Sequence, residues 1–249
     1  MSGLLLAGDV YIDRLTDAGV STGLVGPINV TQLSLNTPSE TKDRTSKKKE
    51  SYGQVLDSVV LAQPTEITIA IDDQPSDILA LALLGDLETI NQGSGTVTDT
   101  AVTLPADNKW LKLPHGNLAE GATAKLASDD SAISPAAYEV NYALGLVRSI
   151  PDGALDTGSD TAIKLSYSHN AVAGNRIKGA VRSTIRMRLM MDGKNLANGK
   201  PVKLQVPEAV VSPTEAVDLF ASEYVSTGLS GKVKLLDGET APFYLDQEA

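Results

Sequence analysis

The chain of 249 residues contains no cysteine, so it can form neither a disulfide nor a thiolate metal site. Aromatic residues make up only 4% of it, which requires an aliphatic core and disfavours binding of sugars or single-stranded nucleic acid on aromatic platforms. Long apolar runs are also missing, since the one nearest the N-terminus covers only residues 4–7. We therefore expect no signal peptide and no membrane span, and a soluble protein made in the cytoplasm.

Basic residues are outnumbered, with 21 Lys and Arg against 31 Asp and Glu and a formal charge of −10. Such a surface repels nucleic acid, because phosphate binding needs Lys and Arg to displace counterions. No Lys or Arg occurs in residues 51–107, a stretch rich in Asp and Glu. A basic cluster lies just before it: Lys42, Arg44, Lys47, Lys48 and Lys49. This segregation favours an acidic surface that meets a basic surface of a neighbouring copy over DNA binding.

Motifs of catalysis and cofactor binding are absent, so we expect no enzyme, no cofactor and no metal site. His115 and His169 are far apart in sequence and lack ligand-spaced carboxylates, which favours surface or turn positions for both. The sequence leaves a Ser–His–Asp triad open, but no G-x-S-x-G elbow supports one. The glycines of residues 93–95 lack the third glycine of a dinucleotide fingerprint. Asp72 and Asp73 are better placed to start a helix than to act as an acid/base pair.

Alternation of apolar and polar residues recurs along the chain and predicts a mainly β fold. Ile67, Ile69 and Ile71 share one parity, as do the apolar residues of a longer run at 177–191. The opposite parity of that run carries Lys178, Arg182, Arg186 and Arg188. We expect one long strand there with a basic face. Its cations would lie against a neighbouring subunit or pair with carboxylates on an adjacent strand.

Two segments carry helix signals. Pro75 suits a first helical position and Gly85 a C-terminal cap, and the residues between them at 78–84 are apolar all round. This predicts one short buried helix on the flank of a sheet. A capping-box pattern at residues 212–215 predicts a second helix over residues 216–220.

The middle of the chain differs in composition from its ends. Residues 92–175 are rich in Gly, Ser, Thr, Ala and Asp, which predicts a β-rich unit inserted into a first domain of residues 1–91 and 176–249. The glycines at 93–95 and the stretch 173–175 are the expected hinges. The polar segment 37–54 is long for a loop. Two interpretations stay open for it: a solvated mobile hairpin, or an arm that becomes ordered on a partner subunit.

Several segments are similar to those of one protein family. They are GPINVT at 26–31, SETK at 39–42, GQVLDS at 53–58, the strand and helix at 66–85, and the ending at 223–233. In these outer parts, the chain resembles the major tail tube proteins of long-tailed, siphovirus-like bacteriophages. The inserted unit departs from the smallest members of that family.

The resemblance implies a β-sandwich or half-barrel with a flanking helix, in a structural protein of the virion tail. Copies would be made and assembled in the host cytoplasm, close into hexameric rings and stack into a tube through which viral DNA is ejected. The family's partners would be the tape measure protein, the tail terminator and tail tip proteins, with DNA passing without specific binding. The segment 37–54 would reach a neighbouring ring, and the lumen would be acidic.

Two other functions are weighed against this one. The inner tube of a contractile tail or a related injection system uses the same fold and is poorly separated by sequence. An extracellular β-sandwich module for binding or adhesion belongs to another class, and the missing secretion signal and scarce aromatics disfavour it. A hydrolase on a β-scaffold has no motif to support it.

Overall fold

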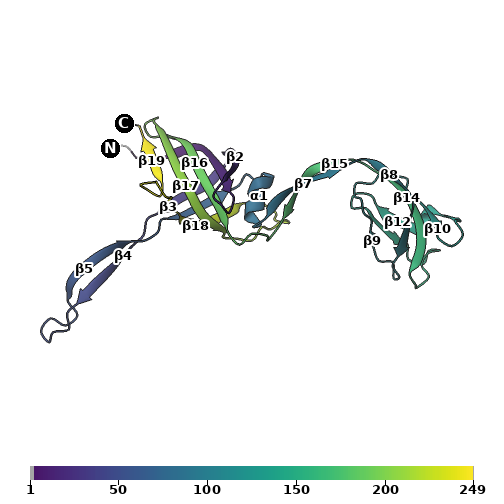
Figure 1. Ribbon diagram of the computed structural model, residues 1–249, viewed down its shortest axis with the longest axis horizontal. Helices are drawn as coiled ribbons and strands as arrows, with labels where there is room; N and C mark the ends of the chain where they lie inside the picture. The colour runs from purple at the N-terminus through teal and green to yellow at the C-terminus, as the bar shows by residue number, and fades with distance from the viewer. Residues whose placement is uncertain (1–2, 249) are drawn as a thin grey trace. The chain divides into compact units, whose positions relative to one another are not determined.

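The computed structural model describes residues 3–248 and is mainly β, with 53% of residues in strands and one short α-helix among the described residues. The chain divides into two compact units, which we call the main unit (Met1–Glu88 and Ile177–Ala249) and the inserted unit (Thr89–Arg176). The division falls close to the bounds of 92 and 175 expected from composition. Figure 1 shows the elements of both units along the chain.

The main unit is built on one curled antiparallel sheet. Its strands are β1 (Leu6–Leu15), β2 (Ser21–Ile28), β3 (Val30–Asn36), β6 (Glu66–Ile71), β16 (Ile185–Asn195), β17 (Pro201–Pro213), β18 (Thr227–Val233) and β19 (Tyr244–Gln247). They follow the order β2-β1-β16-β17-β18-β6-β3, with β19 added on β17. The two end strands β2 and β3 are separated only by Asn29, so the sheet must curl until its ends meet at this residue.

The core of the main unit lies inside this curl and is aliphatic. Ile67, Ile69 and Ile71 of β6 all point into it, as their alternation predicted. The predicted helix is confirmed as α1 (Ser76–Ala82), which packs against β17 and β18. Its Ile78 and Leu81 complete the same cluster, which explains why this short helix has no polar inner face.

Two predictions about the main unit were wrong. The run 177–191 is not one strand, because β15 (Val172–Lys178) ends and the chain turns before β16 begins. The N–H groups of Ala180, Val181 and Arg182 donate to carbonyls at the C-terminal end of α1, which holds the turn in place. The second helix does not form either. Strand β17 continues to Pro213 because Ser212 and Pro213 pair with β18, so the first two capping-box residues belong to a ladder and cannot start a helix.

The inserted unit has its own core between two sheets. One sheet has the order β11-β10-β14-β8 and the other β12-β13-β9. The seven strands are β8 (Gly95–Leu104), β9 (Leu111–Lys112), β10 (Thr123–Leu126), β11 (Ala132–Ile133), β12 (Tyr138–Asn141), β13 (Leu146–Ser149) and β14 (Thr161–His169). A 3-10 turn at Pro135–Ala137 precedes β12. The core between them is separate from that of the main unit and, besides aliphatic side chains, includes buried Tyr138 and Tyr167.

Paired strands carry the chain into and out of the inserted unit. Strand β7 (Asp86–Gln92) leads in and β15 leads out, and the two pair with each other. The predicted hinge glycines at 93–95 lie at the break between β7 and β8. The stretch 173–175 expected as a hinge lies inside β15. Glycine composition alone could not reveal that these residues pair across more than eighty positions of sequence.

Candidate assembly surfaces

The first candidate surface is the projecting hairpin formed by β4 (Ser39–Thr45) and β5 (Val55–Ala62) (Figure 1). The segment 37–54 therefore contains strand β4 and the turn of a hairpin. All residues of β4 and β5 are exposed, and the two strands pair only with each other. Their outer edges and both their faces are thus free for another chain to bind.

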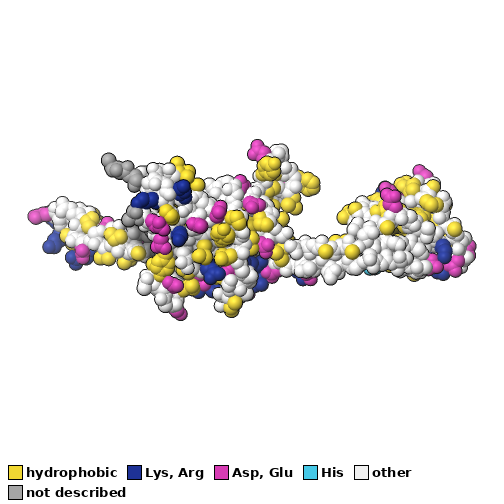
Figure 2. Space-filling model, turned by 90° about the horizontal axis from the view of Figure 1, so that it is seen from above, with side chains coloured by type: hydrophobic (Ala, Val, Ile, Leu, Met, Phe, Trp, Pro, Cys, Tyr) yellow, Lys and Arg dark blue, Asp and Glu magenta, His cyan; other side chains and the backbone are white. Residues whose placement is uncertain are grey.

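One face of the projecting hairpin combines charge with apolar surface. The register sets Lys42 opposite Val59 and Arg44 opposite Asp57. Lys42 forms an ion pair with Glu40, which lies opposite Leu61 on this same face. The other face carries Val60, which is 65% exposed. Figure 2 shows hydrophobic and basic side chains interspersed along this projection. The hairpin can therefore bind a partner that offers both apolar groups and carboxylates.

The tip of the hairpin presents Lys47, Lys48 and Lys49. All three are exposed, and the structure of residues 3–248 gives none of them an ion pair. The turn behind them is ordered by buried Ser46, whose hydroxyl lies 2.7 Å from that of Ser51. The tip thus holds a local excess of positive charge at a defined position.

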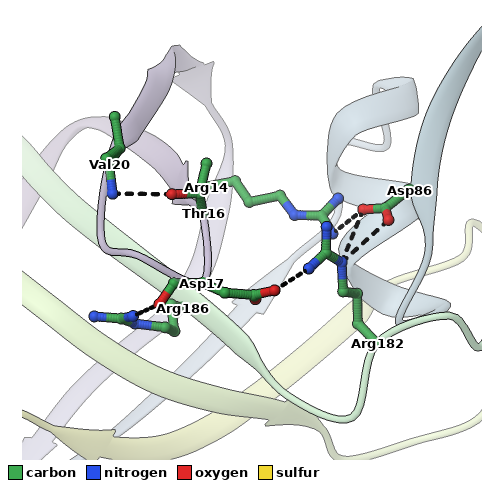
Figure 3. Close-up of polar contacts among 7 residues, drawn as sticks. All are labelled: Arg14, Thr16, Asp17, Val20, Asp86, Arg182 and Arg186. Atoms are coloured by element: carbon green, nitrogen blue, oxygen red, sulfur yellow. Dashed lines mark hydrogen bonds and ion pairs between the residues drawn. The ribbon is translucent and has the colours of Figure 1, made fainter.

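The second predicted group, Arg182, Arg186 and Arg188, is neutralised inside its own chain. The Nε atom of Arg182 lies 3.1 Å from the carboxylate of Asp86, and its Nη1 lies 2.6 Å from that of Asp17. Arg14 also contacts Asp86, at 2.6 Å. Figure 3 shows the guanidinium groups of Arg14 and Arg182 both directed at Asp86, and Asp17 between Arg182 and Arg186. These contacts fasten the β1–β2 turn and the start of β7 to the turn before β16.

The outward face of β16 continues this pairing. Arg186 donates to Glu208 at 2.9 Å, and Arg188 lies 2.6 Å from Asp13. Glu208 and Asp13 are both buried, on the neighbouring strands β17 and β1. Lys178, at the end of β15, pairs with Glu88 at 3.0 Å. All four basic residues thus pair with carboxylates of the same chain, and the partners of Arg186 and Arg188 are set by the strand register, which sequence reasoning did not supply.

The titration of Asp86 follows from this geometry. Partial desolvation raises its pKa, but the hydrogen bond from Arg182 and the positive charges of Arg14 and Arg182 outweigh that effect. The net result is a pKa of Asp86 below its ordinary value. The same contact with Asp86, followed by the charge of Asp17, raises the pKa of Arg182. Both groups are therefore charged at neutral pH.

A third surface was missed by sequence reasoning. The segment 214–226 between β17 and β18, which we call the aromatic loop, was expected to contain a helix. It instead exposes large apolar side chains: Leu219 is 72% exposed, Phe220 97% and Tyr224 98%. The sequence offered no signal for this exposure, because the helix predicted over 216–220 includes Phe220, whereas no strand or helix forms around it.

The two histidines, which are far apart in sequence, lie together in the inserted unit, and both are half-buried. The His115 and His169 rings stack with centroids 3.9 Å apart and planes inclined by 4°. Nδ1 of His115 lies 3.1 Å from the Tyr167 hydroxyl. Among the described residues, no group of three or more His, Asp or Glu side chains is arranged to hold a metal ion.

Within residues 3–248, none of the helices is long and apolar enough to cross a membrane.

The fold and these surfaces define a class: a mainly β protein of two units, with a projecting basic hairpin and an exposed aromatic loop on the main unit. The chain belongs to the family described as protein of unknown function UCP028589, which matches residues 4–241 and so spans both units. No curated protein matches its sequence.

Proposed function

We propose that this chain is a structural virion protein whose copies polymerise as stacked, hexameric rings into a phage tail tube. The tube is the channel through which viral DNA reaches the host. In this role the chain is made and assembled in the host cytoplasm and resides in the virion tail. Its partners are other copies of itself, the tape measure protein inside the tube, and the terminator and tip proteins at its ends.

The projecting hairpin is the observation that carries this proposal. A two-stranded hairpin without packing on either face is at best marginally stable in water. Here every residue of both strands is exposed, including the apolar side chains Val55, Leu56, Val59, Val60 and Leu61. Such a segment gains stability when another chain covers it. Binding between copies supplies that cover and repeats in every subunit.

Charge supports the conduit role. The chain carries a net charge of −10. Arg182, Arg186 and Arg188 each have a carboxylate partner within 3.1 Å, whereas the exposed Lys194 near the end of β16 has no ion pair in the described chain. A ladder of unpaired cations repeated in each ring would bind phosphates along the whole channel and hold DNA in place. The three paired arginines give no such ladder.

Negative-stain electron microscopy with sedimentation velocity over rising protein concentration tests the proposal. We expect rings or hollow tubes above a threshold concentration. A chain that stays monomeric throughout would overturn the proposal and favour a binding module. Neighbouring genes distinguish a flexible tail from the inner tube of a contractile tail, since only the latter requires a sheath protein.

A further inference from the structure

The aromatic loop is built as a binding surface. Its base is closed by the Thr214 N–H, which donates to Gly228 O at 2.9 Å. Its apex is held by Asp218, whose carboxylate accepts from the Phe220 N–H at 2.9 Å. The loop therefore presents Phe220 and Tyr224 outward, at 97% and 98% exposure, from a turn with internal hydrogen bonds. Aromatic side chains of this kind are the commonest anchors of protein interfaces.

The charge of the aromatic loop defines its partner. Residues 214–226 contain Glu215, Asp218 and Glu223 and no Lys or Arg. A partner must therefore offer apolar surface beside positive charge. The projecting hairpin has both, since its tip carries Lys47 and its neighbours together with exposed Tyr52, and β5 exposes Val55 and Leu56 where it leaves the tip. Opposite charge and exposed apolar groups thus match between two surfaces of the same chain.

The topology keeps the two surfaces apart within one molecule. The projecting hairpin leaves the sheet at Asn36 and Glu66, which pair with each other at one end of β6. The aromatic loop returns to the sheet at Thr227, which pairs with Ile71 at the other end of the same strand. Figure 1 likewise shows the hairpin and α1, which follows Ile71, at opposite sides of the sheet.

From this we infer that the aromatic loop of one copy binds the projecting hairpin of the next copy. The inference rests on the proposed self-assembly and names the contact that drives it. Because the two surfaces differ and lie at opposite ends of β6, the contact is head-to-tail. Each bound copy still offers a free hairpin at one end and a free loop at the other, so the association continues.

Charge reversal tests the contact in the full-length chain. Glu215→Lys with Glu223→Lys makes the loop basic and spares Asp218, which holds its apex. Lys47→Glu with Lys49→Glu makes the hairpin tip acidic. Each double variant brings like charges together at the contact, so we expect its threshold concentration for assembly to rise at least about tenfold. Far-UV circular dichroism at low concentration verifies that each variant is folded.

Two combinations isolate direct contact from other effects. In an equimolar mixture of the double variants, every loop meets a hairpin of opposite charge, so assembly is expected to return. The quadruple variant is expected to assemble alone for the same reason. Lys200→Glu with Lys203→Glu, which reverses two exposed cations without an ion pair in the described chain, is a matched control and keeps the wild-type threshold.

Phe220→Ser with Tyr224→Ser tests the apolar part of the contact. We expect the threshold to rise at least about tenfold, whereas Leu144→Ser with Leu196→Ser, at other exposed positions, leaves it unchanged. If the double charge variants assemble like the wild type, or their mixture stays dispersed, the loop–hairpin contact is overturned while the proposed tube stands. If the wild type itself never assembles, the proposed function and this contact both fall.

Discussion

Arg188 is expected to be one of the strongest single determinants of stability in the main unit. Asp13 beside it is 0% exposed. Its carboxylate accepts from Ser21 Oγ at 2.6 Å and from the N–H groups of Thr22 and Gly23 at 3.1 and 3.0 Å. Arg188 Nη2, at 2.6 Å, is the cation in this set. Arg188→Met keeps the aliphatic stem and leaves a buried carboxylate without its counter-charge.

The expected loss of unfolding free energy in Arg188→Met follows from the ion pair that is lost and the hydrogen bonds that remain. Removing one partner of a fully buried ion pair typically costs about 3–5 kcal/mol. The Arg188 side chain is 35% exposed, and its Nε is buried without a partner among the described residues, so part of its own desolvation cost is relieved. The three other hydrogen bonds to Asp13 persist. We therefore expect a loss of about 2–3 kcal/mol in the free energy of unfolding, or about 5–10 °C in Tm for a unit of this size.

Thermal and urea unfolding can be followed for the two units separately. Trp110 is the single tryptophan and lies in the inserted unit, so its fluorescence reports that unit, while far-UV circular dichroism follows both. Arg188→Met should lower the midpoint of an unfolding transition seen by circular dichroism and leave the midpoint of the Trp110 fluorescence transition unchanged.

Asp13→Asn added to Arg188→Met should restore part of the loss, because the buried charge is removed. Lys203→Met, at an exposed position without an ion pair in the described chain, is the control. Equal stability of the Arg188 and Lys203 variants would refute the assignment of the Asp13 charge as buried and paired.

Further expectations concern other parts of the fold. Trypsin should cut first within residues 46–54 in the dispersed chain and be blocked there in the assembly, as mass spectrometry of early fragments would reveal. Gly231→Ala places a Cβ 2.0 Å from a backbone oxygen of β17 and should lower the unfolding free energy by about 1–3 kcal/mol. Gly174→Ala, whose Cβ would meet nothing within 4 Å, should lower it far less. Because the pKa of Asp86 is lowered on folding, its contribution to stability is complete at neutral pH and is lost as the pH falls from about 4 through the folded value. Asp86→Asn should therefore flatten the acid side of the unfolding profile. Replacing residues 93–171 by a short Gly-Ser turn should leave the main unit folded by circular dichroism.

Local patterns predicted the elements that bury one set of side chains in the core. The alternation around Ile69 puts one face of β6 into the core, and the apolar stretch after Pro75 lets α1 be buried, so both elements form as expected. The patterns failed where long-range pairing overrides local preference. Ser212 has the chemistry of a helix cap but pairs with Ser230, and that partner is not visible in a local window.

The candidate surfaces were predicted to a similar degree. Cations stand out in an acidic sequence, so the basic tip and the strand-face arginines could be identified from composition and parity. Their partners could not. Asp13 and Glu208 come from strands on either side of β16, at positions that depend on register. The exposure of Phe220 likewise depends on where β17 ends.

The pairing at the root of the inserted unit has a consequence for how the family can diversify. Gly95 at the start of β8 lies opposite His169 at the end of β14, so the unit begins and ends at the same point. Any domain with adjacent termini can replace it in one recombination event without disturbing the ladder of β7 and β15. The same position is suited to fusing a fluorescent protein or an antigen, which would then be carried once by every copy of the chain.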